Sequence, residues 1–73
     1  MKARIGRVKF FNSVKASFKG GAVTELSFVD VSLTPYKKYS ISIDDTLIRV
    51  TNTETDETSY TSLHNVVFFT LLE

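Results

Sequence analysis

Residues 39–50, with the sequence YSISIDDTLIRV, decide the fold class of this 73-residue chain. In the first five positions apolar and polar side chains alternate strictly, which is typical of a β-strand that turns one face to the core. Tyr39, Ile41 and Ile43 are the side chains predicted to lie inside. Asp44 and Asp45 are typical turn residues, and a second strand follows with Ile48 and Val50 on one side. The segment therefore predicts two short strands joined by a tight turn.

The sequence after this segment also predicts short strands separated by turns. Residues 52–57 are polar and acidic, which predicts a surface hairpin loop, and residues 58–61 form the return strand. Ser62–Asn65 has the character of a single helical turn. The apolar segment 66–72 is expected to be a final strand that is buried on both faces.

The sequence before it also predicts strands. Residues 3–12 are rich in β-formers, Asn12-Ser13 is a turn signal, and residues 14–18 are expected to form a second short strand. In residues 22–33 the apolar positions change parity, which a bulge near Ser27 would explain, with a short helical turn as the alternative. Residues 34–38 form a tight connection in which Pro35 fixes the backbone.

Strands this short, separated by regular turn signals, predict an all-β protein. We expect residues 1–73 to form a single domain, a small five- to six-stranded antiparallel barrel or half-barrel with at most one short helical turn. Two topologies are open. One is the OB-like barrel, and the other is the SH3-like barrel, in which a one-turn helix commonly precedes the last strand.

Composition limits the class of protein. The chain has no cysteine, and 42% of its residues are hydrophobic, which is enough for a core. It has no run of about 18 apolar residues, so we expect no membrane span. No apolar region follows the first four residues, so we expect no signal peptide and a cytoplasmic protein. A domain this small buries only about 60% of its unfolded surface, and oligomerisation is one way to add stability. A homo-oligomer is therefore expected.

The charges are distributed unevenly. Residues 1–19 hold six basic residues and no acidic one, a net +6, whereas residues 20–73 hold three basic against eight acidic residues, a net −5. Such a split indicates a polyanionic partner or a head-to-tail contact between copies. The alternative is that folding interleaves the two sets on a mixed surface.

The segment 6–19, GRVKFFNSVKASFK, combines the basic residues with aromatic rings. If Val8 and Phe10 face inward, then Arg7, Lys9 and Phe11 share the outer face of a strand. Exposed rings stack on nucleic-acid bases and cations bind phosphate, so we expect a single-stranded RNA or DNA partner. The alternative is that these rings lie in the core and that the lysines guard a sheet edge. The candidate binding residues are Arg7, Lys9, Phe10, Phe11, Asn12, Lys15, Phe18 and Lys19.

The stretch GRVKFFNSVK at Gly6–Lys15 resembles the opening strand of cold-shock domains, whose pattern is close to G-x-V-K-[WF]-F-N-x-x-K. The resemblance implies an OB barrel that stacks single-stranded bases on surface rings. It carries binding roles to Lys9, Phe10, Asn12 and Lys15, and it turns Phe10, not Phe11, to the ligand. The chain departs from the family further on, since residues 16–20 read ASFKG in place of G-F-G-F-[IV].

Catalysis is not expected. His64 is the only histidine, the adjacent Asp44 and Asp45 are poorly placed for an acid–base pair, and neither a calcium loop nor a phosphate-binding loop is present. We therefore expect no enzyme, no metal and no cofactor. Two other functions are open. One is a self-assembling or protein-interaction module that uses the apolar residues 66–72, and the other is a small accessory subunit, for example phage-encoded.

Overall fold

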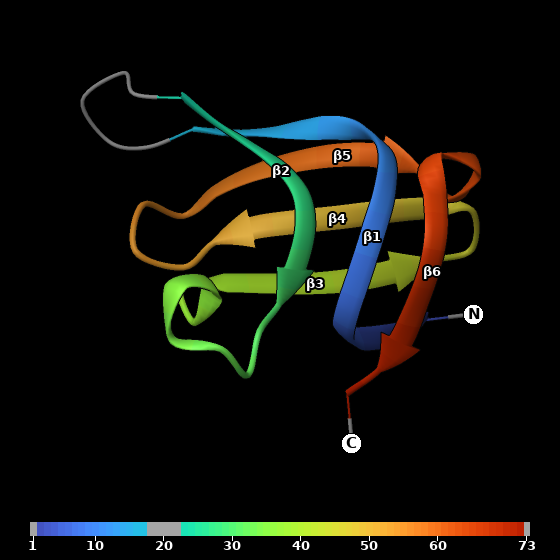
Figure 1. Ribbon diagram of the computed structural model, residues 1–73, viewed down its shortest axis with the longest axis horizontal. Coiled ribbons are helices and arrows are strands. Elements are labelled where there is room, and N and C mark those ends of the chain that lie inside the picture. Colours follow the sequence, from blue (N-terminus) through green and yellow to red (C-terminus); the bar gives the residue numbers. More distant parts are fainter. Residues whose placement is uncertain (1, 18–22, 73) are drawn as a thin grey trace.

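The computed structural model describes residues 2–17 and 23–72 of the chain. These residues form strands and two short 3-10 turns (Figure 1). In chain order the elements are β1 (Lys2–Ser17), β2 (Val23–Asp30), η1 (Thr34–Tyr36), β3 (Tyr39–Asp44), β4 (Leu47–Asn52), β5 (Glu57–Ser62), η2 (Leu63–Asn65) and β6 (Val66–Leu71). The predicted all-β class is confirmed.

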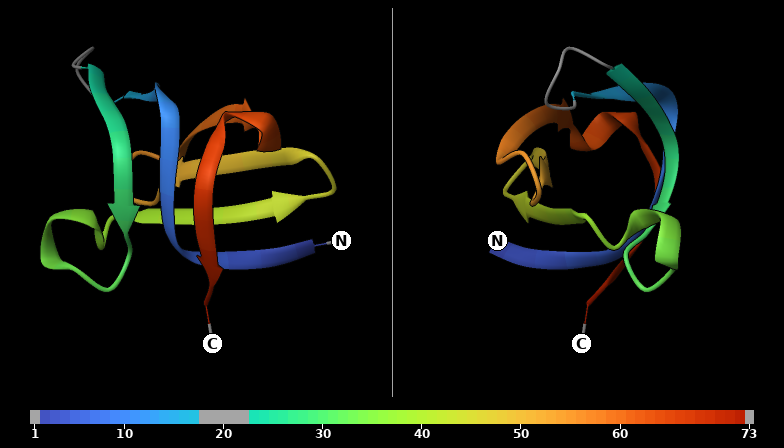
Figure 2. Two further views of the ribbon diagram at one scale, coloured as in Figure 1. Left: turned by 45° about the vertical axis from the view of Figure 1, so that its right-hand side comes forward. Right: turned by 90° about the vertical axis from the view of Figure 1, so that its left-hand side faces the viewer.

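All six described strands belong to one antiparallel sheet that curls into a half-barrel (Figure 2). The hydrogen-bonded order is β2-β1-β3-β4-β5, and β6 pairs with β1. Figure 1 shows β2, β1 and β6 crossing in front of a layer made of β3, β4 and β5. β1 joins the two layers because its first residues pair with β3, whereas its middle pairs with β2 and β6.

β1 runs without a break through Asn12 and Ser13, where the sequence predicted a turn between two strands. That prediction was wrong because residues 14–17 stay paired with β2, so the chain bends without reversing. Ser59 of β5 donates a hydrogen bond through its hydroxyl to the carbonyl of Lys15, which holds the far part of β1 against the other layer. The end of the predicted second strand, Phe18, lies outside the described residues.

A large bulge produces this bend. Lys9 pairs with Phe28 and Val14 pairs with Leu26, so the four intervening residues of β1 lie opposite Ser27 alone. Bulges of this kind bend a strand and change which residues face the core. The bulge predicted near Ser27 is thereby confirmed, since Leu26 and Val29, which differ in parity, are both buried, and the alternative of a helical turn there is not formed.

The core follows the alternation predicted for the central strands. β3 is buried at every second residue, and β4 is buried at Ile48 and Val50 but exposed at Leu47 and Arg49. The buried apolar side chains are Ile5, Val8, Phe10, Val14, Ala16, Leu26, Val29, Tyr39, Ile41, Ile43, Ile48 and Val50. They come from the inner faces of both layers.

β6 differs from its prediction. It was expected to be buried on both faces, but only Val66 and Phe69 pack against the core, while Val67, Phe68 and Leu71 are exposed. The reason is that one face of β6 packs against the core while these three side chains remain exposed to solvent, and the described pairing of β6 is with β1 alone.

The two 3-10 turns are one more than the sequence predicted. η2 is the helical turn expected before the last strand. η1 replaces the tight connection expected at residues 34–38, and Pro35 lies in its first positions, where the fixed φ of proline suits the start of a helical turn. The described residues contain no helix with the length and apolar character needed to cross a membrane.

Candidate nucleic-acid interface

Strand alternation places Lys9 on the outer face of the front layer. Val8 and Phe10 on either side of it are buried, so the side chains of Arg7, Lys9 and Phe11 point outward as predicted. In the sheet Lys9 is directly opposite Phe28 of β2 and Phe68 of β6. Directly opposite residues of an antiparallel pair lie on the same face, so the side chain of Lys9 leaves the same face as a phenylalanine on each neighbouring strand.

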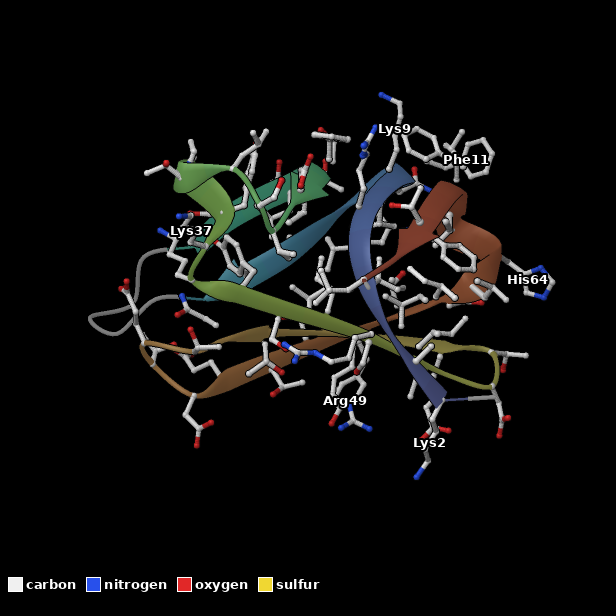
Figure 3. All side chains as sticks on the ribbon, turned by 90° about the horizontal axis from the view of Figure 1, so that it is seen from below. Lys2, Lys9, Phe11, Lys37, Arg49 and His64 are labelled. Carbon is white, nitrogen blue, oxygen red and sulfur yellow. The ribbon has the colours of Figure 1, made fainter. Side chains whose placement is uncertain are left out.

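Phe11 extends this surface. Its side chain is 68% exposed, the largest fraction among the exposed large hydrophobic residues. Figure 3 shows Lys9 and Phe11 projecting from the same side of the molecule. We call the outer surface formed by Lys9, Phe11, Phe28, Tyr36 and Phe68 the aromatic face. Tyr36 is partly buried against the core and is included at the edge of this surface because its ring meets the Phe28 ring edge-on, with 6.4 Å between the centroids and 85° between the planes.

The bulge that carries Phe11 is held by Asn65. The Asn12 backbone N–H donates to Asn65 Oδ1 at 2.8 Å, and Asn65 Nδ2 donates to the Asn12 carbonyl at 2.9 Å. In a third hydrogen bond, Asn65 Nδ2 donates to Thr61 Oγ1 at 3.1 Å. The amide group thus takes the place of a β-ladder partner where the bulge interrupts pairing, and it fixes the backbone next to Phe11.

Arg7 is next to this surface but is paired with an acid. Its Nε lies 3.7 Å from Asp30 Oδ2, and the two residues are directly opposite each other on β1 and β2. Asp30 also accepts hydrogen bonds from the Ser32 hydroxyl at 2.6 Å and from the Ser32 N–H at 3.0 Å. These hydrogen bonds, with a smaller contribution from Arg7, lower the pKa of Asp30 below its usual value.

Folding therefore mixes the charges that the sequence separates. Lys15 lies directly opposite Glu25, and Lys2 lies 4.0 Å from Asp44. Within the described part of the chain, no ion pair involves Lys9. Lys9 is thus the cation of the aromatic face that is left without an acidic partner there.

The structure does not place all of the predicted binding residues on the aromatic face. Phe10 is 3% exposed and lies in the core, so its ring is not on the surface, contrary to the orientation that the cold-shock resemblance implied. Asn12 is exposed, and its backbone rather than its side chain makes the described hydrogen bonds. Lys15 is exposed, but it lies beyond the bulge and does not belong to the aromatic face. Phe18 and Lys19 lie outside the described residues.

A shallow groove borders Phe11 on the η2 side. It is lined by Phe11, Asn12, Ser13, Thr61, Ser62, His64 and Asn65. His64 is exposed on its rim (Figure 3), and its backbone N–H donates to the Ser62 hydroxyl at 3.1 Å, which caps the turn. Small hydroxyl and amide groups thus lie beside an exposed ring, an arrangement that can accept a flat ligand with polar edges.

Sequence reasoning missed Phe28, Tyr36 and Phe68 as members of the site. Their residue types alone did not indicate a binding site, because apolar and aromatic residues in a small domain are most simply assigned to the core. The information that was lacking is the register of β1 with β2 and β6, which places two of them beside Lys9.

The site is suited to binding by stacking and charge. The described residues contain no group of His, Cys, Asp and Glu side chains that could hold a metal ion. Comparison of the chain with protein-family models, with curated proteins and with solved structures finds no match.

Proposed function

We propose that the protein binds single-stranded nucleic acid on the aromatic face. The observation that carries the proposal is the position of Lys9, which has no acidic partner within the described residues and lies between Phe28 and Phe68. Bases would stack on the exposed rings of Phe11 and Phe68, and Lys9 would contact a phosphate. Single-stranded nucleic acid offers both groups at the spacing of one nucleotide.

The expected affinity is modest. Base stacking on an aromatic side chain contributes about 1–3 kcal/mol per base, so two exposed rings supply about 2–6 kcal/mol. A total near 6 kcal/mol corresponds to a dissociation constant of about 40 μM. Each phosphate contact to a single strand adds about −0.7 to the slope of log K against log salt. Lys9 alone predicts a slope of about −0.7, and Arg7 would double it.

Fluorescence anisotropy of a labelled oligothymidylate tests the proposal at two salt concentrations. Phe11→Ala should weaken binding about tenfold, which corresponds to the loss of about 1.4 kcal/mol of stacking, and Lys9→Gln should reduce the salt slope by about 0.7. The matched controls are Tyr60→Ala, an exposed ring on β5, and Lys37→Gln, an exposed cation at the end of η1. No binding, or binding that Phe11→Ala leaves unchanged, would refute the proposal.

A second function is favoured by β6. The segment Val66–Leu71 has no charged residue and no proline, whereas edge strands of soluble proteins are commonly guarded by such residues. Val67 is 44% exposed and Leu71 is 50% exposed on this strand. We propose that β6 pairs with β6 of a second copy and so forms a dimer.

Sedimentation velocity over a concentration series tests this second function. The wild-type protein should form a dimer, and the double variant Val67→Lys, Leu71→Lys should be a monomer because like charges would face each other across the edge. Circular dichroism checks that the variant keeps its fold. A wild-type protein that stays monomeric at millimolar concentration would exclude the dimer. Because neither substitution lies on Lys9 or Phe11, the two functions can fail separately.

A further inference from the structure

A second basic surface lies on the opposite side of the molecule from the aromatic face. Figure 3 shows Lys2 and Arg49 projecting from the side opposite to Lys9 and Phe11. There a shallow pocket is lined by Lys2, Ala3, Arg4, Ser42, Ile43, Asp44 and Arg49. We call it the basic pocket. It belongs to the outer face of β1, β3 and β4.

The register of three strands creates this pocket. Arg4 of β1 and Arg49 of β4 are both directly opposite Ser42 of β3, one on each side. Neighbouring strands are about 4.8 Å apart, so the two arginine Cα atoms are separated by about 10 Å. A serine between two long side chains leaves a hollow, and both guanidinium groups can reach over it.

The pocket keeps an excess of positive charge. Three cationic side chains line it, and Asp44 is its acidic residue. Asp44 Oδ2 is 3.9 Å from Arg49 Nη2 and 4.0 Å from Lys2 Nζ, both longer than a hydrogen bond. Among the described ion pairs none involves Arg4. Most donors of the two guanidinium groups are therefore free to bind a ligand.

We propose that the basic pocket binds a phosphate group. The planar fork of arginine donates two parallel hydrogen bonds to phosphate oxygens, and here two such forks flank the hydroxyl of Ser42. Lys2, whose side chain is 83% exposed, adds a mobile positive charge at the rim. A phosphate dianion bound there neutralises the excess of two positive charges that remains after Asp44 is counted.

The phosphate could be a free anion or part of a nucleic-acid backbone. Two titrations followed by ¹H–¹⁵N correlation spectra distinguish these sources. One uses inorganic phosphate and the other uses the dinucleotide dTpdT, each against sodium chloride at the same ionic strength. The signals to follow are the Nε–Hε groups of Arg4 and Arg49 and the backbone amide of Ser42.

Saturable shifts of these signals with either phosphate probe, and none with chloride, are the expected result. The probe that saturates at the lower concentration identifies the source. The double variant Arg4→Gln, Arg49→Gln should weaken binding at least about tenfold, because it removes charge-assisted hydrogen bonds. Lys37→Gln, which removes an exposed cation outside the pocket, should leave binding unchanged.

Asp44→Asn gives a test that misfolding cannot imitate. It removes the one negative charge of the pocket, so binding of inorganic phosphate should become several-fold tighter. Shifts that chloride reproduces, that persist in the double variant, or that weaken in Asp44→Asn would overturn the proposal. Because Lys9→Gln and Phe11→Ala leave this pocket intact, its failure is distinguishable from failure of the aromatic face.

Discussion

Replacing Asn65 by alanine removes the side chain that holds the bulge of β1. The amide group accepts a hydrogen bond from the Asn12 N–H at 2.8 Å and donates one to the Asn12 carbonyl at 2.9 Å. Alanine leaves both backbone groups to water, or unpaired if water cannot reach them. The residues next to Phe11 then lose the contact that fixes their path.

The minimum size of the effect follows from these two hydrogen bonds, since the part-buried bond from Asn65 Nδ2 to Thr61 Oγ1 is lost as well. A hydrogen bond contributes about 0.5–1.5 kcal/mol net to stability. Because both bonds are accessible to solvent, we take the lower half of that range, about 1–2 kcal/mol for the pair. In a domain of this size 1 kcal/mol shifts Tm by about 4–8 °C, so Asn65→Ala should lower Tm by about 4–16 °C.

Urea denaturation followed by circular dichroism measures this change. The midpoint should fall while the m-value stays constant, because the surface exposed on unfolding does not change. Asn12→Ala is the matched control, since the described hydrogen bonds use the backbone of Asn12, and it should cost less than about 0.5 kcal/mol. Asn65→Asp should be less stable than Asn65→Ala at neutral pH, because a carboxylate oxygen would face the Asn12 carbonyl.

Two results would refute this reasoning. One is an Asn65→Ala protein as stable as the wild type, which would mean that the bulge is stable without the hydrogen bonds from Asn65. The other is an Asn12→Ala protein that loses as much stability as Asn65→Ala, which would assign the effect to the Asn12 side chain.

Three further predictions concern stability. Ile48→Ala should cost about 2–5 kcal/mol, because Ile48 is 0% exposed in the core, and urea denaturation will show whether the variant still folds. Asp56 has φ 60°, so Asp56→Gly should be more stable than Asp56→Ala by about 1 kcal/mol, measured by the shift in midpoint. The lowered pKa of Asp30 means that its contribution is present above the ordinary carboxyl pKa of 3.8 and is lost as pH falls through the lowered value, so acid denaturation should show that Asp30→Asn flattens the decline of stability below that ordinary pKa.

The sequence predicted the features of the candidate site that depend on neighbouring residues, and it failed for those that depend on residues far apart in the chain. The outward direction of Arg7, Lys9 and Phe11 was correct because alternation is a property of the strand itself. The same rule placed Phe10 inside, against the orientation that the cold-shock resemblance implied, and the ring is indeed buried.

The turn predicted at Asn12-Ser13 shows where local reasoning fails. Both residue types favour turns, but here the backbone is held by Asn65, a residue 53 positions away. A tertiary hydrogen bond thus overrode a local preference. No pattern in residues 10–14 carries that information.

By itself the sequence determined the all-β class, the strands β3 and β4 and their buried sides, because side-chain alternation with period two depends only on neighbouring residues. Only the tertiary structure decided which residues meet across strands. It placed Phe28 and Phe68 beside Lys9, paired Arg7 with Asp30, and left β6 exposed at the sheet edge. The physical reason is that register and neighbours follow from contacts between distant segments, which the order of residues along one strand does not specify.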